Sequence, residues 1–292
     1  MAFGDIALTA GMRNNLVSLQ SLADLLNRTQ TRLATGKKVN SALDDPVAYF
    51  AALAHTSAAS DLEGLKNDMN EAIQAVKSAN NGITGILSLI EQAKSVANSA
   101  KATTDQATRT ADVAAYNALR TQIDNIAADS GYGATNFNAG DSLTVSFNPG
   151  GTSTLVITGN AADSATLGIT AAVTSPGAPG GWDTGAGTTL TAGEVTTANG
   201  IIDADIALLD AAKNTLKANS QSMSSNLSVI STRIDFTSNM ENVLVDGSNK
   251  LTLADTNEEG ANMLALQTRN QLGIVSLSLA GQAAQSVLRL FP

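Results

Sequence analysis

The chain has 292 residues, with 17 basic and 26 acidic side chains, a net charge of −9, one His and no Cys. Hydrophobic residues make up 43% of it but aromatic residues only 3%, so the apolar material is mostly aliphatic. The lack of Cys excludes disulfides, a thiol nucleophile and thiolate metal sites, and the acidic balance argues against a nucleic-acid partner. This composition favours long, thin helices over one bulky globular core.

The sequence also argues against membrane insertion. The longest uncharged stretch, between Arg269 and Arg289, is interrupted by Gln and Ser residues and is too polar to cross a bilayer. The first residues do not resemble a secretory signal peptide, because Asp5 stands where a basic region is needed and no apolar region follows. Taken alone, these observations predict a soluble, cytosolic protein.

Apolar residues at alternating spacings of three and four predict helices in the first half of the chain. The first helix covers residues 12–33, with Gly36 as its stop signal. The second begins after residue 46 and keeps its phase to residue 100, which argues for a rod. A shorter third helix is predicted over residues 105–129.

The chain changes character between Ser130 and Glu194, where Gly, Thr, Ser and Asn are frequent and the helical spacing disappears. Two short apolar runs separated by an Asn-Pro-Gly-Gly turn predict a β-hairpin at about 141–158. Residues 174–193 are rich in Gly and Pro, and we expect a short exposed variable loop there.

Helical phase resumes at Ile202 and continues to Leu244, and a break is expected around residues 246–248, where the sequence reads Asp-Gly-Ser. The pattern does not define the course of residues 235–259. The last predicted helix, over residues 258–291, has apolar or small residues on several sides and should be surrounded by other segments.

The two ends of the chain therefore match each other, with a short and a long helix before the middle and a long and a short helix after it. The predicted fold is mainly α, a long antiparallel coiled coil or helical bundle formed by the N- and C-terminal halves, with a small β-hairpin and loop region in the middle. We expect residues 1–45 and 255–292 to form one domain of terminal helices, and residues 46–173 and 194–254 to form a rod. Apolar surface left over on the terminal pair points to neighbouring subunits.

Candidate chemical sites are few. A zinc site needs several ligands, so the single His55 is read as a partly buried residue of a helix bundle. Asp44 and Asp45 could form a catalytic carboxylate pair, but their position before Pro46 is typical of helix capping. We therefore predict no catalytic residue, cofactor or metal, and a protein that is not an enzyme.

The segment from Leu26 to Pro46 resembles the signature of bacterial flagellins. The residues that carry this likeness are Leu33, Gly36, Val39, Asn40, Ser41, Ala42, Asp44 and Asp45. The C-terminal runs 262–269, 277–280 and 285–291 look like the flagellin C-terminus, and the match is closest to the alphaproteobacterial type.

The resemblance implies a structural subunit that self-assembles into the bacterial flagellar filament for swimming motility, with terminal helices lining a central channel. It also implies type III export without a cleaved signal peptide to an extracellular location, which replaces the cytosolic prediction. The implied partners are further copies of the chain in a helical homopolymer, the export apparatus and its chaperone, and the filament cap and junction proteins. A hook–filament junction protein and a secreted helical adhesin are the alternatives.

Nine apolar residues of the terminal helices are the predicted assembly interface, although each could equally pack within one subunit. They are Met12, Leu16, Leu19, Leu26, Leu33, Leu266, Leu277, Val287 and Phe291. The stretch 90–97 lacks most of the Arg pattern that an innate immune receptor reads in enteric-type flagellins, so we expect weak activation of the flagellin-sensing Toll-like receptor.

Overall fold

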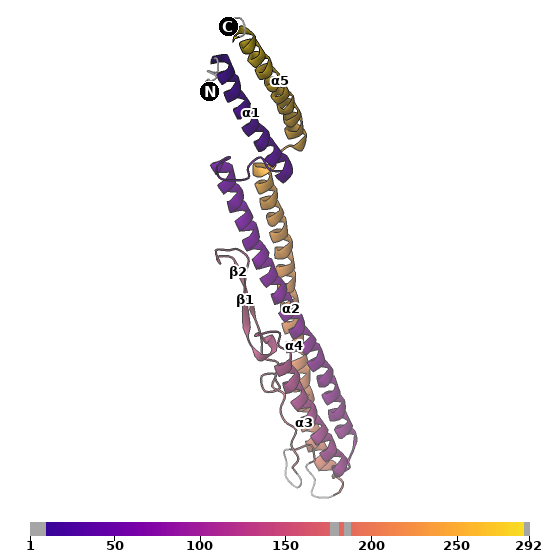
Figure 1. Ribbon diagram of the computed structural model, residues 1–292. Coiled ribbons are helices and arrows are strands. Elements are labelled where there is room, and N and C mark those ends of the chain that lie inside the picture. Colours follow the sequence, from indigo (N-terminus) through magenta and orange to yellow (C-terminus); the bar gives the residue numbers. More distant parts are fainter. Residues whose placement is uncertain (1–9, 176–180, 184–187, 289–292) are drawn as a thin grey trace, which may run out of the picture. The chain divides into compact units, whose positions relative to one another are not determined.

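A computed structural model describes residues 10–175, 181–183 and 188–288 of the chain. Its elements, in chain order, are α1 (Ala10–Thr35), α2 (Pro46–Ala102), α3 (Gln106–Asp129), the short 3-10 helix η1 (Phe137–Ala139), β1 (Ser142–Ser146), β2 (Thr154–Thr158), α4 (Ala192–Thr252) and α5 (Thr256–Leu288) (Figure 1). The predicted mainly α fold with a small hairpin in the middle is confirmed. The chain divides into two compact units, residues 61–240 and residues 1–60 with 241–292.

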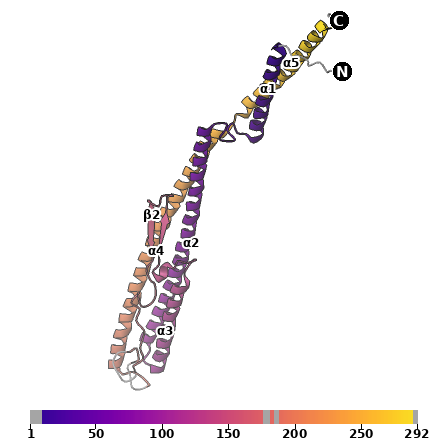
Figure 2. The same ribbon diagram turned by 60° about the vertical axis from the view of Figure 1, so that its left-hand side comes forward.

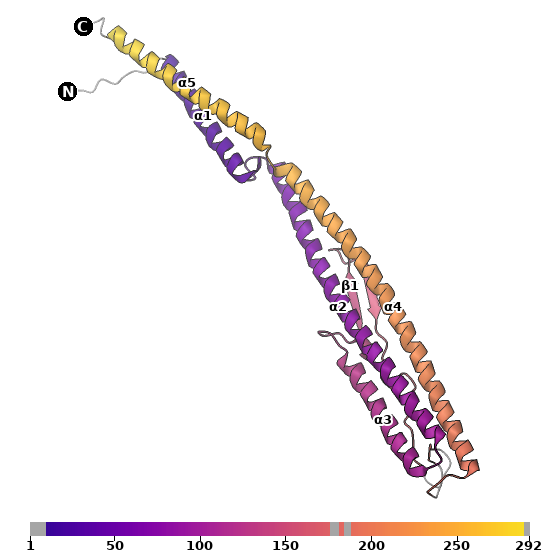
Figure 3. The same ribbon diagram turned by 90° about the vertical axis from the view of Figure 1, so that its right-hand side faces the viewer.

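The core of the 61–240 unit lies along α2 and α4, which run side by side in it (Figure 3). On α2 a single stripe from Met69 to Ala100, at spacings of three and four, is almost completely buried. On α4 every seventh residue from Ile202 to Thr237 is buried, which is the repeat of a coiled-coil seam. The long in-phase pattern predicted for these helices is therefore confirmed.

Ion pairs between α2 and α4 show that the two helices are antiparallel. The ammonium group of Lys94 lies 2.7 Å from Asp210, and that of Lys101 lies 2.5 Å from Asp203. Lys213 of α4 pairs with Glu91 of α2, and the Ser220 hydroxyl of α4 donates to Oδ1 of Asn80 of α2 at 2.9 Å. These polar side chains of α4 therefore find partners across the helix pair.

Residues 162–175 have little regular structure, and side chains of α3 bind the backbone of this segment and of Trp182. Asn117 donates to the carbonyl of Ala172 and accepts from its N–H, at 2.8 and 3.0 Å. Arg120 donates to the carbonyl of Ile169 at 3.0 Å, and the fully buried Arg109 donates to the carbonyl of Trp182 at 2.9 Å. These bonds satisfy backbone groups that a strand or helix would otherwise pair.

The expectation of an exposed loop over residues 174–193 is wrong at its centre. Trp182 and Asp183 are fully buried, the Trp182 ring packs against Tyr116, and its indole N–H donates to Asp205 at 2.7 Å. The physical reason is that one large aromatic side chain has enough apolar surface to anchor a loop rich in Gly. Residues 176–180 and 184–187 of this segment lie outside the described part of the chain.

The hairpin pairs Leu143 with Ile157 and Val145 with Leu155 in antiparallel register. Val145 and Ile157 are buried against the helices, and Gly151 has a φ of +64°, which the turn between the strands requires. The Arg233 guanidinium of α4 lies 4.9 Å from the centre of the Phe147 ring, next to that turn. The hairpin is thus held against the helix pair by its apolar face and by one cation–π contact.

In the other unit, the last part of α4 packs against the first part of α2. The predicted break at residues 246–248 is wrong, because α4 continues to Thr252 and ends only at residues 253–255. The Ser248 hydroxyl donates to the carbonyl of Ala52 at 3.2 Å, and Gly247 lies beside the His55 ring. Packing on α2 offsets the roughly 1 kcal/mol that a Gly costs inside a helix.

Candidate assembly surfaces

The terminal helices α1 and α5 lie side by side and antiparallel (Figures 1 and 2). One half-buried stripe on α1 contains Met12, Leu19 and Leu26, and the facing stripe on α5 contains Leu266 and Leu277. None of these five side chains is fully buried, because a pair of helices covers only one side of each seam. A two-helix pair of this kind leaves much of its apolar surface in contact with water.

The two helices approach each other closely at Gly273 of α5. A β-carbon at this position would lie 2.6 Å from Cδ2 of Leu19, so the two helices meet with no room for a larger residue. A spacing pattern in the sequence contains no information about this approach distance.

An ion pair joins the helices at the end of α1. Nη1 of Arg32 lies 2.8 Å from Oε1 of Glu259, and the side chains of the two residues are 25% and 9% exposed. The Asp255 carboxylate accepts the N–H groups of Asn257 and Glu258 at 2.9 and 3.3 Å and so caps the start of α5. The α1–α5 helix pair is therefore held together at this end by a salt bridge, beside the capped start of α5.

Large apolar side chains are exposed on both terminal helices. On α1 they are Leu16, Val17, Leu25 and Leu33, which are 38–64% exposed. On α5 they are Leu264, Leu272, Ile274, Val275 and Leu279, which are 57–67% exposed. A soluble monomer rarely exposes so much contiguous apolar surface without a binding role, so the exposed faces of α1 and α5 are the best candidates for contacts with other subunits.

A groove between the two helices adds positive charge to this surface. Its lining includes Leu25, Arg28, Leu266 and Arg269, and its two hollows, of about 290 Å³ each, meet at Leu25 and Arg269. The groove combines an apolar floor with guanidinium groups, which suits an apolar partner segment that carries carboxylates.

All residues of the flagellin-like signature except Leu33, which lies in α1, belong to the connection between α1 and α2. Gly36 ends α1 with a φ of +68°, which is unfavourable for residues with a β-carbon. Lys37 forms a β-bridge with Leu253, the N–H of Lys38 donates to the carbonyl of Thr252 at 2.7 Å, and Val39 is only 6% exposed. Residues of the α1–α2 connection are thus hydrogen-bonded to the end of α4 and to the α4–α5 connection.

The two neighbouring carboxylates of the signature accept hydrogen bonds from different backbone segments. Oδ2 of Asp44 accepts the N–H groups of Asn40 and Ser41 at 3.0 and 3.1 Å, and these bonds hold the pKa of Asp44 below its usual value. Oδ1 of Asp45 accepts the N–H of Ala48 at 3.0 Å at the start of α2. The helix-capping interpretation is therefore correct for Asp45, whereas Asp44 closes the loop before it.

One exposed apolar row beside the signature is absent from the predicted interface. It consists of Leu43, Val47, Phe50 and Leu53, which are 53–97% exposed. Their spacings of four, three and three place them on one side of the chain at the start of α2, a periodicity that could have identified them from the sequence.

The nine predicted interface residues do not share one environment. Met12, Leu19, Leu26, Leu266 and Leu277 lie between α1 and α5 of the same chain, whereas Leu16 and Leu33 face away from that contact. Val287 lies within α5 in a stretch whose side chains are outside the described set, and Phe291 lies outside the described residues.

Within the described residues, no cluster of His, Asp and Glu side chains has the arrangement of a metal site. None of the described helices is apolar over a length that would cross a membrane.

A chain whose two terminal helices pair with each other and expose large apolar side chains has the features of a self-associating structural protein. Residues 8–141 match the family described as the bacterial flagellin N-terminal helical region, and residues 200–291 match the bacterial flagellin C-terminal helical region. The chain belongs to the bacterial flagellin family and is a structural subunit of the flagellar filament.

Relatives in two alphaproteobacteria agree with this assignment. The chain is 26% identical to Flagellin FljO and 29% identical to Flagellin FljK of Caulobacter vibrioides, in both cases over the full length of both chains. It is 44% identical to Flagellin C of Rhizobium meliloti over 69 residues, which cover 22% of each chain. The resemblance found in the sequence and its alphaproteobacterial type are confirmed, and a filament subunit is favoured over a junction protein or an adhesin.

Proposed function

We propose that this flagellin polymerises through its paired terminal helices, which become ordered and buried when they meet the same helices of neighbouring copies. The observation that supports this is the exposed apolar surface on both α1 and α5. Fully burying a large aliphatic side chain contributes about 1.5–3 kcal/mol. The side chains on α1 and α5 are already partly covered, so several of them must be buried together to offset the cost of association.

In this proposal the nine predicted residues have two roles. Leu16 and Leu33, which are exposed in one chain, contact a neighbouring copy directly. Met12, Leu19, Leu26, Leu266 and Leu277 hold α1 against α5 and so present the assembling surface. Val287 and Phe291 are also assigned to contacts with a neighbouring copy. Residues 1–45 and 255–292 form the inner, channel-lining part of the filament, and residues 46–173 and 194–254 form the rod around it.

The proposal also covers the route to the filament. The subunit leaves the cell through the flagellar type III export apparatus, without a cleaved signal peptide and with an export chaperone, and assembles outside between the junction and cap proteins. The absence of Cys fits this route, because an exported chain then cannot be trapped by a wrong disulfide.

Deleting residues 1–35 tests the proposal. Without α1, purified protein should not form filaments that sediment, while the Trp182 emission and the helical circular dichroism of the rest of the chain should stay native. A second test uses Leu272→Gln with Val275→Gln, which removes exposed apolar surface only, and Gln271→Ala as a control on the same helix. Normal filaments from the deleted protein would contradict the proposal. Bulk polymerisation of the intact monomer also separates a filament subunit from a junction protein, which is needed in few copies.

A further inference from the structure

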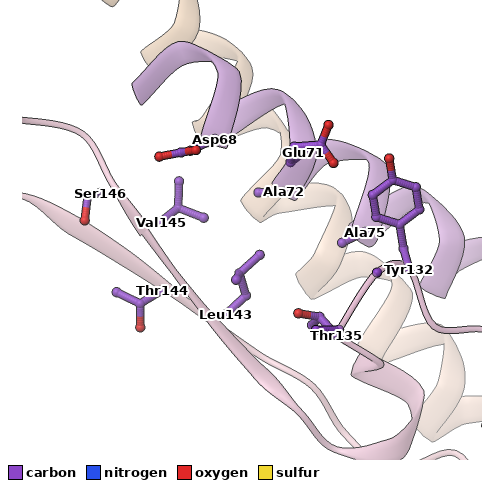
Figure 4. Close-up of a pocket in the computed structure, with 12 residues that line it drawn as sticks. Asp68, Glu71, Ala72, Ala75, Tyr132, Thr135, Leu143, Thr144, Val145 and Ser146 are labelled. Atoms are coloured by element: carbon purple, nitrogen blue, oxygen red, sulfur yellow. The ribbon is translucent and has the colours of Figure 1, made fainter. Parts of the chain in front are cut away.

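A pocket opens between α2 and β1 in the 61–240 unit (Figure 4). Its volume is about 360 Å³, and Leu143 and Val145 point from β1 toward the helix, where Ala72 and Ala75 complete an apolar floor. The charged side chains at its rim are the carboxylates of Asp68 and Glu71, and no cation is among its lining residues. The segment 132–135 closes one end, where the Tyr132 hydroxyl donates a hydrogen bond to Glu71.

The solvent-facing side of α4 carries apolar side chains and a positive charge, which complement the apolar floor and the carboxylates of the pocket. Val229, Arg233, Phe236 and Met240 follow one another at spacings of four, three and four, so they share one face of the helix. We name these four residues the α4 stripe. Val229, Phe236 and Met240 are 42%, 55% and 39% exposed, and Arg233 is exposed too and forms no ion pair with any described residue. The α4 stripe is thus an apolar row with one guanidinium in it.

The α4 stripe does not fill the pocket of its own chain, because no residue of α4 lines that pocket. The pocket is bordered by α2 and by residues 143–146 of β1, whereas Arg233 of α4 reaches Phe147. Within one chain the guanidinium of Arg233 lies over the Phe147 ring, and no cation is among the described residues that line the pocket with the two carboxylates. A second copy of the chain therefore carries the group that complements the pocket.

Building on the proposed polymerisation, we propose that the α4 stripe of one copy docks into the β1 pocket of a neighbouring copy. The Arg233 guanidinium lies between the carboxylates of Asp68 and Glu71, whose geometry suits its parallel N–H donors. Val229 and Phe236 cover the apolar floor beside this ion pair. Because the two surfaces differ, each copy uses its stripe on one neighbour and its pocket on another, and such head-to-tail contacts build an open assembly or a ring.

Charge reversal tests the docking. In Asp68→Arg the pocket repels the incoming Arg233, and in Arg233→Glu the stripe is repelled by the pocket, so each single variant should raise the critical concentration for polymerisation about tenfold. The combined variant Asp68→Arg with Arg233→Glu restores an attractive pair and should return to within about threefold of the wild-type value. Glu63→Arg and Lys217→Glu are matched controls, because they change exposed charges outside both surfaces and should polymerise like the wild type.

Only variants with native helical circular dichroism and native Trp182 emission are compared. A loss of folding is then not counted as a loss of docking. Single variants that polymerise like the wild type would overturn the docking, and so would a combined variant that folds but does not regain assembly. A wild-type monomer that fails to polymerise at all would instead contradict the proposed function, so the two ideas fail by different results.

Discussion

Cδ2 of Leu19 on α1 fills the space in which a β-carbon at Gly273 of α5 would lie, at 2.6 Å from that position. This relationship fixes both the distance and the register of the terminal pair, because a Leu knob fits a hole that only a Gly leaves. Since the proposed assembly surface is made of both helices, their register decides which exposed side chains a neighbouring copy meets.

Gly273→Ala should therefore weaken polymerisation. The added methyl group displaces the end of a flexible side chain, so we expect a moderate cost of about 1 kcal/mol and a critical concentration several times higher in sedimentation assays. Leu19→Ala with Gly273→Ala removes the clash and should recover part of the loss.

Gly281→Ala is the matched control for this test, because a β-carbon at that position meets nothing within 4 Å. It should leave assembly unchanged or improve it slightly, since Ala favours helix more than Gly does. Equal effects of the substitution at positions 273 and 281 would contradict the proposed fit.

The Arg32–Glu259 ion pair should stabilise the terminal unit. Glu259→Gln keeps the shape of the side chain but removes its charge, and leaves the guanidinium without its partner in a setting where the acid is only 9% exposed. We expect a loss of about 1–3 kcal/mol, measured as faster hydrogen exchange of the amides of α1 and α5. The exposed neighbour Glu258 provides the control, and Glu258→Gln should exchange like the wild type.

Sequence periodicity predicts a helix well where one side of that helix is buried, because burial requires apolar residues at helical spacing. The stripe from Met69 to Ala100 is an example, since its apolar positions are covered by other elements of the same unit. The end of α4 was not predictable in this way. Gly247 is a typical helix breaker, and only its packing next to His55 of α2, far away in the sequence, keeps the helix intact to Thr252.

The loop anchored by Trp182 illustrates a second limit. Its Gly and Pro content favours an exposed loop, but the partners that bury the indole, Tyr116 and Asp205, come from α3 and α4. No local pattern contains that information, because an aromatic residue in a loop is anchored only when a pocket elsewhere in the chain can accept it.

The candidate interface was predictable only in part. On α1 two apolar stripes run next to each other, and spacing alone does not say which of them faces α5. The structure places Leu19 and Leu26 against α5 and leaves Leu16 and Leu33 exposed. The row from Leu43 to Leu53 is absent from the predicted interface, because that prediction is limited to the terminal helices. Leu43 lies in the connection before α2, and the other three residues lie in the first turns of α2.

Trp182 should be an important contact in the 61–240 unit. Trp182→Phe keeps an aromatic ring but removes the N–H that donates to Asp205, which is only 7% exposed and also accepts from Thr170. We expect a loss of about 1–3 kcal/mol in the free energy of unfolding, measured by urea denaturation with circular dichroism. Val173→Ala, at a half-exposed position on the same segment, should cost much less. Equal losses in the two variants would show that the indole hydrogen bond contributes little.

Acid should weaken the pairing of α2 with α4. The hydrogen bond from Lys94 holds the pKa of Asp210 below its usual value, and that from Lys213 does the same for Glu91. A carboxyl with a depressed pKa in the fold stabilises it above the unfolded pKa of about 4, and this contribution fades as the pH falls through the folded pKa. The wild type should therefore lose stability between about pH 5 and pH 2, measured by the midpoint of thermal unfolding.

Replacing the cations separates this effect from general acid denaturation. Lys94→Met with Lys213→Met removes the partners that lower the two pKa values, so the variant should start with a lower midpoint at pH 7 and lose less of it on acidification. High salt should reduce the difference between the variant and the wild type at pH 7, because these exposed pairs are screened. A variant with the same acid slope as the wild type would mean that other carboxyls, such as the capping Asp105 with its own lowered pKa, control the transition.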